Sequence, residues 1–144
     1  MALTNTSSRF TLPHFFLVSN AIIWISAVIV MGIVSYFISE SESYYVSNHA
    51  IYEEVISVLT VAFFLISFFL GKYPGYVLVF NIIFSYLWLV VVVFAAEDWS
   101  SDYASSLGHT VEAFSFIAFF FLFFNVVFDW HFGYRGHART TSAV

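Results

Sequence analysis

The 144-residue chain contains no cysteine and only four Lys or Arg residues. The lack of cysteine excludes disulfides, thiolate nucleophiles, Cys-ligated zinc and lipid anchors on cysteine. The four bases are outnumbered by nine Asp and Glu residues, which gives a net charge of -5. Because so few bases cannot compete for a phosphate backbone, we expect no nucleic-acid partner.

Charge of either sign is scarce, whereas apolar residues dominate. Charged residues make up 9% of the chain, hydrophobic residues 61% and aromatic residues 23%. This apolar content exceeds what one soluble core of this length buries. A membrane-spanning helix needs about 20 apolar residues, and the segments nearly free of charge are 14–39, 50–71, 75–96 and 110–132.

These segments predict an all-α integral membrane protein, with residues 1–144 forming a single four-helix bundle and short loops. In lipid the backbone must satisfy its own hydrogen bonds, so even the aromatic and β-branched runs are expected to be helical. The first segment is longer than the core of a cleavable signal peptide, so we expect it to be retained. Residues 1–13 and 133–144 are the predicted tails, and the second is expected to be a disordered end.

The distribution of charge predicts the orientation in the membrane. All four bases fall on one side of a four-span chain: Arg9, Lys72, Arg135 and Arg139. The loops on the other side contain acids and no base: Glu40, Glu42, Glu97, Asp98 and Asp102. Because cytoplasmic loops carry the excess of Lys and Arg, both termini are predicted to be cytosolic.

The segment Lys72-Tyr73-Pro74-Gly75 predicts a tight turn between the second and third helices. A connection this short makes those helices antiparallel neighbours. The loops on the other side are also short, which leaves no room for a separate extramembrane domain.

Asparagines in three of the predicted spans define a first candidate site. Asn20, Asn81 and Asn125 all lie near one depth, roughly 9 to 10 Å inside the predicted cytosolic boundary, and Ser67 could join them. One interpretation is an interhelical network that stabilises the bundle by about 0.6 kcal/mol per contact. The other is a polar pocket for a lipid headgroup or a small solute.

A second candidate site lies near the opposite ends of the helices. His49 precedes Glu53 by four residues and His109 precedes Glu112 by three, so each pair shares a helix face. If the second and fourth helices lay side by side, these residues and Glu54 would suit zinc, copper or di-iron. Helix capping by the carboxylates and a proton-linked role are the alternatives, and capping is the reading we expect.

No arrangement of catalytic residues is recognisable. The sequence has no plausible Ser/His/Asp set and no phosphate-binding glycine loop, so we expect neither an enzyme nor a cofactor beyond a bound membrane lipid or sterol. Trp24 and Trp88 lie near the middle of their spans. They are expected to pack between helices, with a sterol face as the alternative partner.

Three stretches resemble small fungal-type MARVEL (membrane-associating) proteins: Ile51-Tyr52-Glu53, Asn81 to Trp88, and Val111-Glu112-Ala113-Phe114-Ser115-Phe116. The chain departs from many of those relatives in lacking loop cysteines and in having Asn81 near the place of an acid. The resemblance implies a non-enzymatic plasma-membrane protein that organises lipid microdomains or acts in vesicle traffic. Its partners would be membrane lipids, other membrane proteins or further copies of the chain.

Two other functions are compatible with the sequence. Small size, short loops and abundant Phe suit an accessory subunit of a larger membrane complex. A small proton-coupled transporter is the third possibility, and it would require an essential acid within the membrane. Glu53 and Glu112 lie near the ends of their spans, which makes this function less expected.

Overall fold

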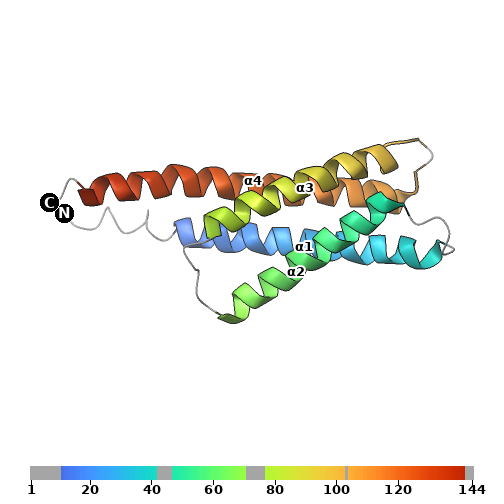
Figure 1. The fold of residues 1–144 in the computed structure, drawn as a ribbon, viewed down its shortest axis with the longest axis horizontal. Helices are drawn as coiled ribbons and strands as arrows, with labels where there is room; N and C mark the ends of the chain where they lie inside the picture. The colour runs from blue at the N-terminus through green and yellow to red at the C-terminus, as the bar shows by residue number, and fades with distance from the viewer. Residues whose placement is uncertain (1–10, 42–46, 71–76, 103, 142–144) are drawn as a thin grey trace.

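The computed structural model of the protein describes residues 11–41, 47–70, 77–102 and 104–141. These residues form four helices, with α1 at Thr11–Glu40, α2 at Asn48–Leu70, α3 at Val77–Trp99 and α4 at Ser106–Thr141 (Figure 1). All four are long and apolar enough to cross a membrane. The predicted all-α, four-span fold is therefore confirmed.

Serine residues set the starts of two helices earlier than the apolar pattern predicted. The Ser47 hydroxyl accepts a hydrogen bond from the His49 amide at 3.2 Å, so α2 begins at Asn48 instead of residue 50. Ser105 accepts from the Gly108 amide at 3.3 Å, and α4 begins at Ser106 instead of residue 110. Such caps satisfy amides that have no partner within the helix.

The helix α4 also continues past its predicted end. The apolar pattern stops near residue 132, but the backbone is helical through Thr141. No proline interrupts this stretch, so nothing in its sequence forces the helix to stop where it leaves the hydrocarbon. The expected disordered end is therefore wrong for residues 133–141, and residues 142–144 lie outside the described part.

The helices form a ring in which each contacts two neighbours. Close backbone contacts join α1 to α2, α2 to α3, α3 to α4 and α4 to α1, whereas within the described residues α2 does not approach α4. The predicted antiparallel pairing of α2 and α3 is confirmed, while its turn lies outside the described residues. The start of α1 and the end of α4 share one side of the bundle, which we call the terminal side (Figure 1). We call the other side, where α1 ends and α4 begins, the opposite side.

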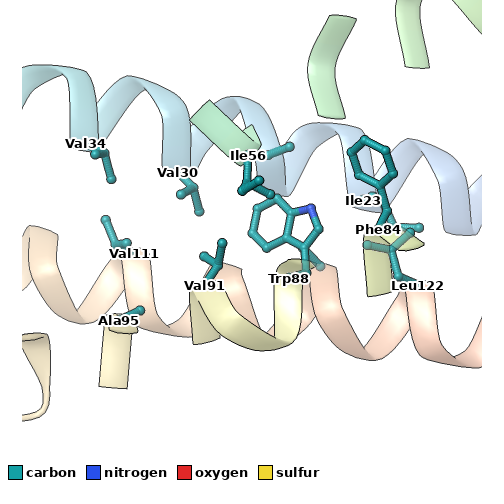
Figure 2. Packing of buried hydrophobic residues seen from close by; sticks show 12 residues of the cluster. Ile23, Val30, Val34, Ile56, Phe84, Trp88, Val91, Ala95, Val111 and Leu122 are labelled. Atoms are coloured by element: carbon teal, nitrogen blue, oxygen red, sulfur yellow. The ribbon is translucent and has the colours of Figure 1, made fainter. Parts of the chain in front are cut away.

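Trp88 of α3 occupies the centre of the apolar core (Figure 2). Its side chain is fully buried, and its indole N–H donates to the Thr60 hydroxyl of α2 at 3.0 Å. Ile56, Phe84 and Leu122 pack around it. Trp88 therefore packs between helices, as expected, while Trp24 is only half-buried.

Small and polar side chains mark the buried faces of the helices. On α4 the buried residues recur at spacings of three and four: Val111, Ser115, Ala118, Leu122 and Asn125. On α1 the buried face likewise includes Ser19, Ser26 and Ala27. This is the spacing of interlocking helices, and small residues let membrane helices approach closely.

The helix α2 contributes fully buried side chains to the bundle over only part of its length. Among its described side chains, the buried ones all lie between Glu53 and Thr60: Glu53, Ile56, Ser57 and Thr60. None of the described side chains from Val61 to Ser67 is buried. Figure 1 shows the C-terminal end of α2 (light green) diverging from the other helices. The bundle therefore has four packed helices on the opposite side and three on the terminal side.

Candidate functional site

Asn125 is the centre of a polar network on the terminal side. Its Oδ1 accepts a hydrogen bond from the Ser19 hydroxyl at 2.8 Å. Its Nδ2 donates to Oδ1 of Asn20 at 3.2 Å. Both partners lie on α1, and the side chains of Asn125 and Ser19 are buried. The network therefore joins α1 to α4 and satisfies the Asn125 amide.

Asn81 makes a separate contact with α4. Its Nδ2 donates to Oδ2 of Asp129 at 3.4 Å, which connects α3 to α4. The sequence did not single out Asp129, although it follows Asn125 by four residues and so shares its helix face. The structure thus places a carboxylate in this layer. The three layer contacts to α4 come from two amides and one hydroxyl, which suits a structural network between helices.

Ser67, the fourth residue of the predicted layer, lies apart from the asparagines. Its side chain is exposed, because α2 has left the bundle at this depth. The layer therefore involves α1, α3 and α4.

The two predicted histidine–glutamate pairs on the opposite side, one on α2 and one on α4, are not brought together into one site. His49 of α2 has its Nδ1 3.1 Å from Oδ1 of Asp98 on α3, and its ring stacks on Phe94. His109 has its Nδ1 3.7 Å from Oε2 of Glu112 within α4. The side-by-side placement of α2 and α4 that a metal site would require is not present, since these helices are diagonal in the ring. Within the described residues, no three His, Asp or Glu side chains are grouped closely enough for a metal ion.

Glu53 is the most unusual polar residue of the bundle. Its side chain has 0% exposure, and neither carboxyl oxygen has a hydrogen-bond partner. The indole N–H of Trp99 lies beside the carboxyl but outside hydrogen-bonding geometry, and Asp98 and His49 are close enough to interact electrostatically. A buried carboxyl without donors is costly. The sequence placed Glu53 near a helix end but did not show that it faces the interior.

The adjacent Glu54 differs from Glu53 in having a partner. One of its carboxyl oxygens accepts a hydrogen bond from the Ser35 hydroxyl of α1, so it links α1 to α2. Two successive carboxylates of α2 thus have different environments, because neighbouring residues on a helix point about 100° apart.

A small pocket of about 270 Å³ lies close to this region, between α1, α2 and α3. Asp98 is its acidic residue, and the rings of Phe37 and Trp99 stack beside it with centroids 4.7 Å apart. The remaining lining residues are Ile38, Ser41, Ser47 and Ala50. The pocket is large enough for water or a small polar group.

Comparison of the chain with protein-family models, with curated proteins and with solved structures finds no match.

Proposed function

We propose that the protein is a non-enzymatic, MARVEL-like membrane organiser that acts in lipid microdomains or vesicle traffic of a sterol-rich membrane such as the plasma membrane. The main support for the proposal is the way polar and apolar side chains are divided between the interior and the outer surface of the bundle. The polar groups within the spans are largely collected in the interior, while large apolar and aromatic residues cover the outside. Such a molecule acts through its lateral contacts with lipid.

The aromatic surface of α4 supports this role. Phe116, Phe120 and Phe124 are exposed at intervals of one helical turn. Their ring centroids are 6.3 and 6.5 Å apart, so they form a continuous strip, and Phe123 lies beside it. Rigid aromatic rings offer a large contact area with little conformational freedom to lose. They therefore suit contact with an ordered, flat lipid such as a sterol.

The filled interior also supports a role at the outer surface. Trp88 occupies the centre of the bundle at mid-depth, with Ile23 and Leu122 packed in the same cluster (Figure 2). At that depth the helices therefore meet through buried apolar side chains.

The test is a gentle-detergent isolation of the tagged protein from its native membrane, with proteins and lipids identified together by mass spectrometry. Enrichment of sterol and sphingolipid over the surrounding membrane, without a stoichiometric protein partner, is the expected result. The matched variant replaces Phe116, Phe120 and Phe124 with Leu, which keeps apolar area but removes the rings. Lipid recovery that matches the bulk membrane in the unmodified protein would contradict the proposal.

An accessory subunit of a larger complex is the second candidate function. The observation that favours it is the exposure of α2 beyond Thr60, where the side chains of Leu65 and Ile66 are exposed. A membrane protein partner recovered in fixed ratio in the same isolation, and cross-linking to this half of α2, would establish this function instead.

A proton-coupled transporter is the third candidate, favoured by the buried Glu53 carboxyl. The decisive variant is Glu53→Gln, which keeps the shape and removes the ionisable group, with Glu112→Gln as the more accessible control. Under the proposed function both variants keep normal expression, location and lipid enrichment. A selective loss of solute transport in vesicles containing Glu53→Gln would favour the transporter.

A further inference from the structure

We propose that the bundle is a wedge, broader on the terminal side, that concentrates in membranes whose terminal-side leaflet is convex. This inference goes beyond the proposed function, because it requires only that the four helices cross the bilayer. It is independent of which lipids or proteins are bound.

All four helices pack together on the opposite side. Each contributes a side chain with 0% exposure near that end: Val34 of α1, Glu53 of α2, Ala95 of α3 and Val111 of α4. Short side chains permit this approach, since Ser57 and Thr60 of α2 are also fully buried. The cross-section of the protein is therefore smallest in this half of the membrane.

The packing differs on the terminal side. Ser19 of α1, Asn81 of α3 and Asn125 of α4 are buried there, so three helices stay together. The corresponding part of α2 still contacts α3 through Phe63 and Phe64, but Leu65 and Ile66 beyond them are 41% and 53% exposed. The end of α2 therefore lies out in the lipid (Figure 1).

A cluster of phenylalanines accounts for the divergence. Phe63 of α2 makes edge-to-face contacts with Phe80 and Phe84 of α3, with centroids 5.3 and 5.7 Å apart. Phe64, also of α2, makes an edge-to-face contact with Phe80 of α3. Within α3, the rings of Phe80 and Phe84 stack with centroids 4.3 Å apart. We infer that the bulk of these four rings keeps the end of α2 from closing on the bundle.

A membrane adapts to the shape of an inserted protein at an energetic cost. A wedge that is broader in one leaflet displaces more lipid there, and the cost is smallest where that leaflet is already expanded by convex curvature. Because both termini are predicted to be cytosolic, the favoured shape is a membrane that bulges into the cytosol, as a forming vesicle does.

The first test measures the divergence itself. The chain lacks cysteine, so pairs of spin labels can be introduced without background. Val18→Cys with Ser67→Cys reports the α1–α2 separation on the terminal side, and Ser39→Cys with Ile51→Cys reports it on the opposite side. In lipid nanodiscs the terminal-side distance is expected to be clearly longer. Equal distances at the two ends would overturn the proposal.

The second test measures the curvature preference. The full-length protein carries one fluorophore, on Thr4→Cys, and is reconstituted in small and large vesicles of a single phosphatidylcholine, without sterol or sphingolipid. Copies with the terminal side outward are distinguished by a membrane-impermeant quencher. Their density per membrane area is expected to be severalfold higher in the small vesicles. Copies in the other orientation are expected to be depleted there, which serves as an internal control.

Two variants connect that preference to the phenylalanine cluster. Phe63→Ala with Phe80→Ala removes two of the rings that separate α2 from the rest of the bundle, and it is expected to shorten the terminal-side α1–α2 distance and abolish the curvature preference. Phe120→Ala with Phe124→Ala removes the same number of rings from the exposed face of α4 and is expected to retain both properties. A wild-type density independent of vesicle size would overturn the proposal, as would an equal response of the two variants. Neither result would bear on lipid enrichment in the native membrane.

Discussion

Gly108 lies buried at the start of α4, where the indole ring of Trp99 packs on its Cα. A Cβ added at this position would overlap carbon atoms of the indole. We therefore expect Gly108→Ala to destabilise the bundle by about 1 to 3 kcal/mol, as overpacking does. The measurement is thermal or denaturant unfolding in mild detergent.

Gly32→Ala is the matched control for that substitution. Gly32 lies within α1 and is exposed, and an added Cβ would have nothing within 4 Å. Alanine in an exposed helix interior is favoured over glycine by about 0.5 to 1 kcal/mol. Gly32→Ala should leave the bundle as stable or more so, and an equal loss in the two variants would contradict the Trp99 contact.

Asn125 supports a second prediction, because it connects two groups of α1 at once. Asn125→Leu removes the partner of both Ser19 and Asn20, and we expect a loss of about 0.6 to 1.7 kcal/mol for an interhelical contact of this kind. Ser67→Ala, at an exposed position of α2, should change stability little. A double-mutant cycle on Asn20 and Asn125 measures the coupling, and zero coupling would show that the contact does not stabilise the protein.

The sequence identified individual polar residues within the spans but not their partners. It placed Asn20, Asn81 and Asn125 at one depth, and the structure connects two of them directly and the third to Asp129. Which way a polar side chain points depends on the rotation of its helix within the ring, and nearly uniform hydrophobicity leaves that rotation unspecified. For this reason the burial of Glu53 could not be foreseen.

At the scale of elements, α2 differs from the other three helices in having no buried side chain among its described residues after Thr60. Segments with few buried contacts open locally at low cost. We expect the amides of 61–70 to exchange hydrogen faster than those of 48–60 in the same nanodisc. The terminal-side half of α3, which packs in the bundle, is the control, and uniform protection along α2 would contradict the prediction.

The existence and number of the helices followed from long apolar segments, but their ends did not. Ser47 and Ser105 begin α2 and α4 through side-chain hydrogen bonds to backbone amides. A hydroxyl outside an apolar run adds nothing to hydropathy, so the predicted starts were a few residues late. The serines before His49 and Gly108 were nevertheless recognisable capping residues.

For the whole molecule, the orientation in the membrane remains a prediction from charge. The start of α1 and the end of α4 lie on the same side (Figure 1). We expect a tag at either terminus to be reached by antibody only after cells are permeabilised. A tag inserted after Glu42 should be reached in intact cells, and the reverse pattern would refute the orientation.

The sequence by itself determined that the chain spans a lipid membrane, that its fold is all-α and that it has four spans. The reason is that roughly 20 consecutive apolar residues can satisfy their backbone hydrogen bonds in lipid only as a helix. Only the tertiary structure decided which helices are neighbours, which polar groups meet and where α2 leaves the bundle. The reason is that lipid and protein interior are equally apolar, so hydrophobicity does not distinguish a buried face from an exposed one. In the structure, small buried side chains and polar contacts between helices join these neighbours.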